Sequence, residues 1–437
     1  MGMSFSSHRW ATVVLASAGV LFACNQILGV EDVKLKANGT RLNNEGGVAG
    51  DDDDDVINRP PPGTLEDGEA PPPEDPARPT LALGFSHSCA RMLDGTVRCW
   101  GTNYSGQLGD GKDAGSGDSP DQLRPKNVVG ITDAVAVASG TTHTCAVRKS
   151  GKVSCWGAGA SGTLGNGKDD DSSTPVDVLG IEDAIAVGAG GPVSCAVHRD
   201  GTASCWGLNS NGGLGDGTTA TSNKPVKVND LKNIVQIAPS TNHTCAVLAS
   251  GELYCWGGAS DGQLGTGSLT PTTKPTKVTT LSDVAQVAVA SRYGCARMKS
   301  GSVACWGRND TGQLGNGSPT DSPNPSPIAV PFISDAIFIW AGYGHTCAVR
   351  KTGAVACWGD ATYGQLGIGP VDAGGQTAST PQPVKDLANA KAVWTGGDRT
   401  CAVTGDNKAY CWGSNFDGEL GIGSTDQKFV PTAVSDF

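Results

Sequence analysis

The chain repeats the pattern Cys-x9-Cys-Trp-Gly seven times, and this pattern constrains the fold more than any other feature. The first cysteines of successive repeats are 56, 50, 50, 50, 52 and 54 residues apart. Such a period indicates an array of similar units, none of which can bury its apolar faces alone. The seven pairs are Cys89 and Cys99, Cys145 and Cys155, Cys195 and Cys205, Cys245 and Cys255, Cys295 and Cys305, Cys347 and Cys357, and Cys401 and Cys411.

Each repeat contains short β-prone runs separated by glycine-rich turns. In the second repeat the runs are AVAVA at 134–138, then HTCAV, KVSCWG and a short run at 175–178. No stretch shows a convincing apolar period of 3.6 residues, so helices are not expected. Four short strands per repeat predict an all-β fold over residues 80–437, a seven-bladed β-propeller of four-stranded blades.

The two cysteines of each repeat are predicted to face each other across a hairpin. If Ser150 is the centre of a three-residue loop, Cys145 lies opposite Cys155 and Gly151 takes the left-handed position of that loop. Opposed Cα atoms are then roughly 4.5 to 5.5 Å apart, inside the disulfide range of about 4.4 to 6.8 Å. We therefore expect seven disulfides within hairpins. A zinc site is not expected, because this spacing lacks C-x2-C clusters.

The repeat resembles the regulator of chromosome condensation repeat family. The matching strings are HTCAV at 243–247 and the segment 251–267, with the GQLG element at 106–109, 262–265, 312–315 and 364–367 and variants at Gly162, Gly212 and Gly418. The resemblance covers about residues 80 to 437 and implies a seven-bladed β-propeller. The chain departs from the family by having cysteines at the two facing strand positions, which are usually apolar.

Two further residue types recur in the repeat. The tryptophans of the CWG motif are interpreted as packing between blades rather than as a ligand platform; they are Trp100, Trp156, Trp206, Trp256, Trp306, Trp358 and Trp412. Four repeats carry a histidine before the first cysteine, at His87, His143, His243 and His345, and the others have Val193, Tyr293 and Arg399 near that place. Because the histidines lie on separate blades, we expect a structural hydrogen bond within each blade rather than a metal site.

The N-terminus resembles a bacterial lipoprotein signal. An apolar segment of 13 residues at 11–23 is too short to span a bilayer as a mature helix, and it ends in LFAC, which is similar to a lipobox. Cys24 is also the one cysteine of fifteen without a partner in the repeats. The resemblance implies a signal peptide at 1–23 and lipidation of Cys24, and Asn25 favours the outer membrane. The alternative is an ordinary signal peptide with an accidental cysteine.

Residues 24–79 are predicted to be a disordered acidic and proline-rich linker. They contain an aspartate run at 51–55 and proline triplets at 60–62 and 71–73, with few aromatic or β-branched residues. The aspartate run is interpreted as a solvated spacer rather than a calcium site. The net charge of −11 and the lack of a basic stripe disfavour nucleic-acid binding. Export would bring the cysteines into an oxidising compartment, so we expect an envelope lipoprotein of the outer membrane or cell surface that contacts the membrane through its lipid.

The sequence contains no recognisable catalytic motif. HExxH, GxSxG, the phosphate loop and the dinucleotide fingerprint are absent, so we expect no enzyme, catalytic site, metal or cofactor. Repeat length varies after the CWG motif at 112–122, 168–173, 318–326 and 370–379, on the face that also bears the loops between first and second strands. Since loops on rigid scaffolds carry function, we expect a binding or scaffolding propeller with a protein or polysaccharide partner on this long-loop face, at residues still unknown.

Two other functions are implied less directly. The nuclear member of the family is a guanine-nucleotide exchange factor, but that activity depends on a wedge-like insertion, and the largest repeat excess here is six residues over a 50-residue unit. Export would also separate the chain from cytosolic GTPases. A glycan-processing propeller is the third class, and the sequence offers no catalytic residues for it.

The lipid anchor makes the first testable prediction. Cys24→Ala is expected to release the protein from membranes or to block its processing, because the acylated sulfur is lost. Membrane fractionation and the mass of the N-terminal peptide measure this, with Asn25→Ala as the neighbouring control. A processed Cys24→Ala protein that stays in the membrane fraction contradicts the anchor.

Overall fold

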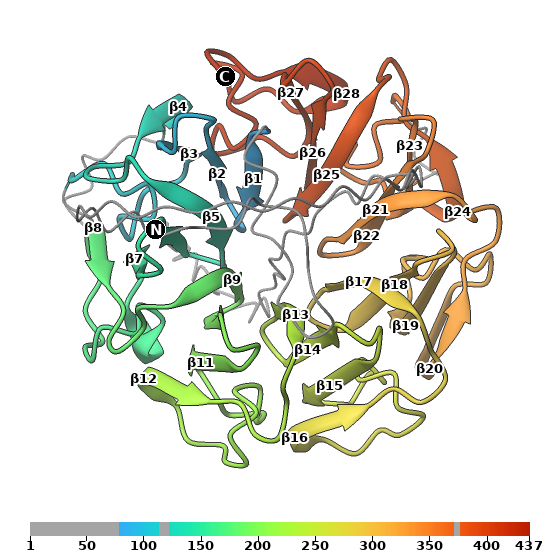
Figure 1. Ribbon diagram of the computed structural model, residues 1–437. Helices are drawn as coiled ribbons and strands as arrows, with labels where there is room; N and C mark the ends of the chain where they lie inside the picture. The colour runs from blue at the N-terminus through green and yellow to red at the C-terminus, as the bar shows by residue number, and fades with distance from the viewer. Residues whose placement is uncertain (1–77, 113–121, 371–375) are drawn as a thin grey trace, which may run out of the picture.

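The computed structural model describes residues 78–112, 122–370 and 376–437, so Cys24, the signal peptide and nearly all of the linker lie outside the described residues. The described part forms seven four-stranded antiparallel sheets arranged in a ring (Figure 1). This confirms the predicted all-β, seven-bladed propeller. Each sheet consists of four strands that are consecutive in the chain, and we number the blades 1 to 7 from β1–β4 to β25–β28.

The strands of each blade run in order from the centre of the ring to its rim (Figure 1). The innermost strands are β1 Thr80–Leu83, β5 Ala134–Ser139, β9 Ala184–Gly190, β13 Ile234–Pro239, β17 Val284–Val289, β21 Ala336–Ala341 and β25 Ala390–Gly396. The second strands are β2 His87–Arg91, β6 His143–Arg148, β10 Val193–His198, β14 His243–Leu248, β18 Tyr293–Met298, β22 His345–Arg350 and β26 Arg399–Thr404.

The other half of each blade contains the CWG motif and the rim. The third strands are β3 Val97–Gly101, β7 Val153–Gly157, β11 Ala203–Gly207, β15 Leu253–Gly257, β19 Val303–Asn309, β23 Val355–Asp360 and β27 Ala409–Gly413. The outer strands are β4 Gln122–Asn127, β8 Ser172–Asp177, β12 Ser222–Lys227, β16 Thr272–Lys277, β20 Thr320–Ala329, β24 Thr377–Pro383 and β28 Lys428–Ala433. A short 3₁₀ helix, η1 Ala160–Gly162, lies between β7 and β8.

The second and third strands are buried on both faces, which explains why they are not alternately polar and apolar. In blade 2 all of β7 is buried, and β6 is buried up to its last residue. Sheets that are covered on both sides need apolar or hydrogen-bonded residues at every position. The HTCAV and CWG strings satisfy this need with small, β-branched and hydrogen-bonded side chains.

The predicted hairpin register is present in the structure. Val147 pairs with Val153 and Cys145 with Cys155, and the same offset recurs in every blade. Gly151 has φ +87°, and a Cβ there would lie 2.4 Å from the Glu182 carbonyl oxygen, so glycine is required at this turn.

All fourteen cysteines of the repeats form disulfides within hairpins, as the facing register predicts. The Cα–Cα distances are 4.0 to 4.1 Å, somewhat shorter than the expected separation of unbridged opposed residues. The bridges join Cys89 to Cys99, Cys145 to Cys155, Cys195 to Cys205, Cys245 to Cys255, Cys295 to Cys305, Cys347 to Cys357, and Cys401 to Cys411. Each blade therefore carries one covalent link between its second and third strands.

The rim of the ring is protected against strand addition. Every outer strand contains proline, as the SSTPVD and SNKPVK strings show, and proline has no N–H to offer another strand. The outer strands are also half-exposed, unlike the buried middle strands. These features limit edge-to-edge association of propellers.

One sequence-based expectation about the loops is wrong. Residues 318–326 were expected to form an irregular loop, but most of them belong to β20, the longest outer strand, whose Thr320 pairs with Asn309. The extra residues of this repeat lengthen both β19 and β20 instead of making a loop, because the added Ser/Thr/Pro sequence is compatible with an edge strand.

The disulfides make the second prediction. Digestion under non-reducing conditions followed by mass spectrometry is expected to find the seven hairpin pairs and no free thiol among these fourteen cysteines. Each bridge closes a loop of about ten residues, so each adds at most roughly 3 kcal/mol to the free energy of unfolding. A sample that is reduced, unfolded and reoxidised is the control for scrambled pairing; inter-blade links in the native sample would contradict the register.

Candidate binding face and the ring of contacts beneath it

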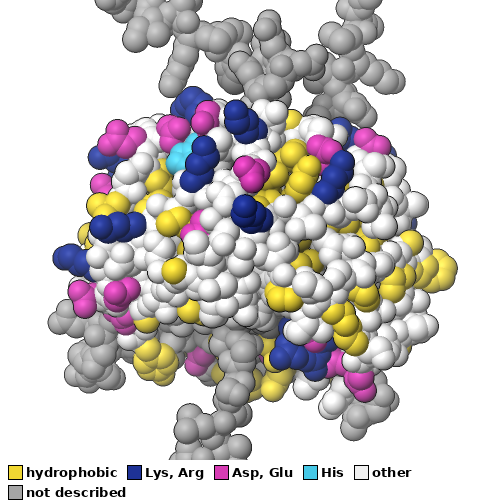
Figure 2. Space-filling model, turned by 90° about the horizontal axis from the view of Figure 1, so that it is seen from below, with side chains coloured by type: hydrophobic (Ala, Val, Ile, Leu, Met, Phe, Trp, Pro, Cys, Tyr) yellow, Lys and Arg dark blue, Asp and Glu magenta, His cyan; other side chains and the backbone are white. Residues whose placement is uncertain are grey.

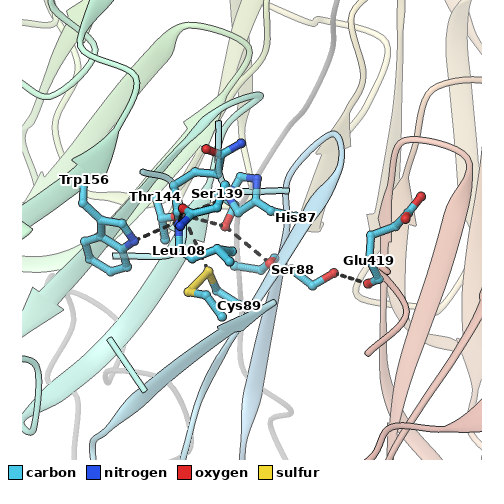
Figure 3. The surroundings of a disulfide bond; sticks show 12 residues. His87, Ser88, Cys89, Leu108, Ser139, Thr144, Trp156 and Glu419 are labelled. Atoms are coloured by element: carbon cyan, nitrogen blue, oxygen red, sulfur yellow. Dashed lines mark hydrogen bonds between the residues drawn. A yellow bond between two sulfur atoms is a disulfide. The ribbon is translucent and has the colours of Figure 1, made fainter. Parts of the chain in front are cut away.

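A backbone carbonyl of each blade accepts a buried hydrogen bond from the next blade around the ring. The indole Nε1 of Trp156 donates to the Gln107 carbonyl at 3.0 Å, and Thr144 Oγ1 donates to the same oxygen at 3.3 Å. Both donors belong to blade 2 (Figure 3). Gln107 lies in the GQLG element of blade 1. The carbonyl uses both of its lone pairs, so the contact is fully satisfied without water.

The tryptophan contact recurs at every junction, including the closure from blade 7 to blade 1. The remaining six donor–acceptor pairs are Trp100–Glu419, Trp206–Thr163, Trp256–Gly213, Trp306–Gln263, Trp358–Gln313 and Trp412–Gln365, at 2.8 to 3.0 Å. All seven indoles are fully buried, so the interpretation as inter-blade packing is confirmed. A glycine of the GQLG element is required here: a Cβ on Gly109 would lie 2.8 Å from the Trp156 ring.

The histidines extend this network around the ring, but not as expected. His87 Nε2 is 2.9 Å from Thr144 Oγ1, so the histidine of blade 1 contacts the hydroxyl of blade 2 (Figure 3). His143 contacts Ser194 Oγ in the same way, at 2.7 Å. The expectation of a hydrogen bond within each blade is therefore wrong for these residues, because the start of the second strand points across the junction.

The other two histidines divide between these two patterns. His345 Nε2 is 2.9 Å from Thr400 Oγ1 of blade 7, which repeats the contact across the junction. The His243 ring instead bonds within its own blade, where its Nδ1 is 3.0 Å from Ser240 Oγ. The expected hydrogen bond within a blade is thus confirmed for His243 alone of the four.

The residues that replace histidine in the other repeats stand at the same position. Tyr293 takes the place of histidine in blade 5, and its hydroxyl accepts from Thr346 Oγ1 at 3.1 Å. Among the described blades, two junctions lack the link, because Val193 is apolar and Gly294 has no hydroxyl to meet His243. At the second of these, Gln236 bridges the inner strands, donating to the Val287 carbonyl and accepting from its N–H at 2.8 Å each. Gln286 makes the same bridge to Ile339 at the next junction.

Arg399 closes the ring at the junction where the two ends of the propeller meet. Its guanidinium donates to the carbonyls of Phe85, Gly396 and His87 and to Ser88 Oγ. The side chain is fully buried, and burial lowers its pKa to about 10. No described sheet takes strands from both ends of the chain, so these side-chain bonds perform a closure that a shared sheet would otherwise provide.

The loop face is the side of the ring that bears the loops between first and second strands and the start of each loop after CWG. Aligned on the repeat, two loop positions carry aromatic residues in blades 6, 7 and 1 and small, polar or charged residues elsewhere. Phe85 and Tyr343 occupy the position two residues before the second strand, and Tyr104 and Phe416 the third position after CWG. They are 37, 44, 68 and 65% exposed. Tyr363 meets Phe416 edge to face at 5.8 Å between ring centroids.

Sequence reasoning missed these aromatic residues, although aligning the repeats at the CWG motif finds them. The long loops that were expected to carry the binding site are only partly described. Residues 113–121 and 371–375 lie outside the described residues, and 318–326 is mostly strand. Residues 168–171 precede β8, where the Asp171 carboxylate accepts from the Gly159 N–H at the loop face.

Charge on the surface is mixed rather than of one sign. In the side view of Figure 2, Lys and Arg side chains alternate with Asp and Glu along the upper edge, and the wall between the edges is largely uncharged. Among the described residues, no group of three or more His, Cys, Asp and Glu is arranged to hold a metal ion. The described chain also contains no helix of the length and apolarity needed to cross a membrane.

The structure is a seven-bladed propeller in which the tryptophan of every blade donates to a backbone carbonyl of the preceding blade. The sequence matches the model of the RCC1-like domain over residues 39–343, and RCC1 repeats are matched at 339–365, 391–419 and 406–437. The chain therefore belongs to the RCC1-like domain family.

Individual relatives are similar over shorter stretches. The probable E3 ubiquitin-protein ligase HERC4 of Mus musculus is 36% identical over 95 residues, 21% of this chain and 9% of that protein. The secretion-regulating guanine nucleotide exchange factor of Mus musculus is 34% identical over 110 residues, 22% of this chain and 24% of that protein. This chain thus spans a quarter or less of the length of these curated relatives.

Solved structures share the fold at low identity. Human WBSCR16 has a TM-score of 0.69 at 22% identity, covering 78% of this chain and 94% of that one. Yeast RCC1 (Prp20), solved with bound Kap60, has a TM-score of 0.70 at 22% identity, covering 86% and 89%. At this identity the comparison establishes the propeller fold alone.

The buried histidines predict a pH-dependent stability. Burial lowers the pKa of His87, His243 and His345 to about 3 and that of His143 to about 4, so all four stay neutral in the folded state at pH 5. In the unfolded chain they protonate below about pH 6.5. The contribution of these histidines to the free energy of unfolding is therefore fully present above pH 6.5. It is lost as the pH falls toward 3 to 4, by about 1.4 kcal/mol per pH unit for each histidine.

Urea unfolding of the oxidised protein at pH 7 and pH 5 measures this loss. His143→Gln keeps a hydrogen-bonding group near Ser194. It is expected to reduce the slope of the free energy of unfolding against pH by the equivalent of one bound proton, about 1.4 kcal/mol per pH unit. The control is Ser150→Ala in an exposed hairpin turn, which is expected to leave the slope unchanged. An unaltered slope in His143→Gln contradicts a buried neutral imidazole.

The closure by Arg399 gives a further prediction. Arg399→Met is expected to lower the free energy of unfolding by about 3 kcal/mol or more, because three carbonyls, two of them in buried hydrogen bonds, lose a donor. Arg399→Lys retains the positive charge but lacks the planar guanidinium with its several N–H donors. It is expected to recover only part of the lost free energy of unfolding. Limited proteolysis is expected to cut first near the junction of blades 7 and 1. Equal stability of wild type and Arg399→Met would contradict this role.

Proposed function

We propose that this protein is an exported, lipid-anchored propeller that binds a protein partner through its loop face. The Cys24 anchor holds it at the outer membrane or cell surface, the acidic linker separates the propeller from the lipid, and the ring presents the binding loops. No chemical step is assigned to the chain.

The observation that carries this proposal is the set of exposed aromatic side chains on a rigid loop face. Phe85, Tyr104, Tyr343 and Phe416 lie on loops of three consecutive blades, although their equivalents elsewhere are not aromatic. Large aromatic residues are enriched at the centres of protein interfaces, and contiguous exposed apolar patches mark interaction sites. The disulfides and buried junctions beneath them supply a scaffold that loses little entropy on binding.

Relatives support a binding role of this kind. Yeast Prp20, which shares the fold, is solved with bound Kap60, and another structure of it is described together with its binding properties to Gsp1p and histones. A protein partner is therefore favoured over a polysaccharide. The ligase and exchange-factor names belong to relatives matched over about a hundred residues, and we propose neither activity for this chain.

The disulfides support export independently of the signal peptide. Disulfides persist in oxidising compartments and are rare in the cytosol, and here the structure contains one in each blade. A guanine-nucleotide exchange activity would require a cytosolic GTPase, so the same observation disfavours it.

The proposal is tested by crosslinking and purifying the full-length protein from its own envelope and identifying the recovered partner. Two loop-face sets are compared, Tyr104→Ser with Phe416→Ser, and Thr141→Ala with Ser210→Ala. The control is the hairpin set Asp94→Ala, Ser150→Ala and Asp200→Ala, in the turns between second and third strands on the opposite side of the ring. Recovery of one defined protein is expected to fall at least tenfold in at least one of the two loop-face sets. Recovery in the hairpin set is expected to stay unchanged. Loss in the hairpin set alone, or recovery of glycan without protein, contradicts the proposal.

A further inference from the structure

The loops between first and second strands of blades 6, 7 and 1 lie side by side on the loop face. The Tyr343 N–H donates to the Gly397 carbonyl at 3.4 Å, and Arg399 Nη1 donates to the Phe85 carbonyl at 2.6 Å. The loops between first and second strands of the three blades are thus tied edge to edge. We use the name aromatic sector for the aromatic rings of these blades and the carboxylates around them. It consists of Phe85, Tyr104, Tyr343, Tyr363, Phe416, Asp360, Asp398, Asp417 and Glu419.

Carboxylates surround these rings. Asp398 lies in the loop of blade 7, between Tyr343 and Phe85 in the order of the ring, and the charges of Asp360 and Glu419 act on it together with burial. Asp417 follows Phe416 directly, and its N–H donates to Glu419 Oε2. The aromatic sector therefore combines ring faces with several negative charges.

One buried cation, Arg399, acts on Asp398, Asp417 and Glu419, but among the described residues these carboxylates form no ion pair of the kind found in blades 4 and 5. In blades 4 and 5, Asp261 lies 3.8 Å from Arg292, and Asp310 pairs with Arg308. None of the ion pairs among the described residues includes Asp360, Asp398 or Asp417. The nearby Arg399 is buried, and its hydrogen bonds go to carbonyls and to Ser88.

Asp398 is the carboxylate most affected by this environment. Burial, followed by the charge of Asp360, raises its pKa to about 6, although the Arg399 charge lowers it. Its Oδ1 is buried without a hydrogen-bond partner among the described residues. A carboxylate in this state gains stabilisation when a cation approaches, because desolvation has already occurred in the free protein.

From these contacts we propose that the aromatic sector is a docking surface for a protein segment rich in Lys or Arg side chains. The proposal rests on the binding role proposed above and adds the chemistry of the partner. Guanidinium and ammonium groups stack on aromatic faces and pair with carboxylates, so one kind of side chain satisfies both components of the sector. A neutral sugar would leave the carboxylates uncompensated, and the chain's own linker, with its aspartate run at 51–55, has the wrong charge.

The test measures binding of a fluorescent Gly-Arg repeat peptide to the full-length oxidised protein at moderate salt. Tyr104→Ser with Phe416→Ser, and separately Asp398→Asn with Asp417→Asn, are each expected to weaken binding at least tenfold. Matched controls are Thr141→Ala and Ser210→Ala, at the repeat positions of Phe85 and Tyr104, and a linker variant in which all five aspartates at 51–55 are changed to asparagine. Each control is expected to stay within twofold of wild type. Thermal unfolding checks that every variant is folded.

The pH dependence provides a second readout. Binding of the peptide is expected to strengthen as the pH rises from 5 to 7, because Asp398 ionises near pH 6, and this increase is expected to disappear in Asp398→Asn. Asp360, Glu419 and Arg399 face residue 398 in the wild type and in Asp398→Asn. Any pH dependence that they cause is therefore the same in the two proteins.

Several outcomes would overturn the inference. Loss of binding in the 51–55 variant alone assigns the peptide to the linker, and loss in the carboxylate variant but not in the aromatic variant indicates nonspecific charge attraction. Preferential binding of neutral dextran through the same aromatic residues indicates a glycan surface. If the envelope partner is captured through the loop face but the Arg peptide is not bound, the proposed function stands and the inference fails.

Discussion

The contact on which this propeller depends is the sharing of one buried carbonyl by two donors of the next blade. Trp156 and Thr144 both donate to Gln107, and an indole reaches the equivalent carbonyl at all seven junctions. Because the donors come from the second and third strands, the hairpin that contains the disulfide is also the element that binds the neighbouring blade. The disulfide therefore fixes the two donors relative to each other as well as closing its own loop.

The sequence was sufficient to predict what occurs inside one blade. The register of Cys145 opposite Cys155 follows from the loop length and from the period of two along a strand, and both are properties of a single repeat. The role of the tryptophans was also predictable, since a large ring that recurs in a packed array has few other uses. The signal peptide and the Cys24 anchor stay predictions.

The contacts between blades were harder to predict. His87 was expected to bond within its blade, and its hydroxyl partner Thr144 lies 57 residues away, where the sequence gives no information about distance. Tyr293 and Arg399 stood at the histidine position in the repeat, so their shared role was visible in an alignment, but the closing bonds of Arg399 depend on where the ring ends. The loop face was anticipated from repeat length, whereas its aromatic residues differ in residue type at constant length and were missed.

The consecutive order of strands within every sheet has one more consequence. The two ends of the described propeller meet at the junction of blades 7 and 1 without sharing a sheet, so in strand pairing this junction resembles the other six. Joining the ends of the propeller by a short peptide and opening the chain between any other two blades would leave all seven sheets and disulfides intact. Strand pairing within each sheet is in this sense independent of the blade at which the chain enters the ring, whereas burial of each blade still requires its neighbours.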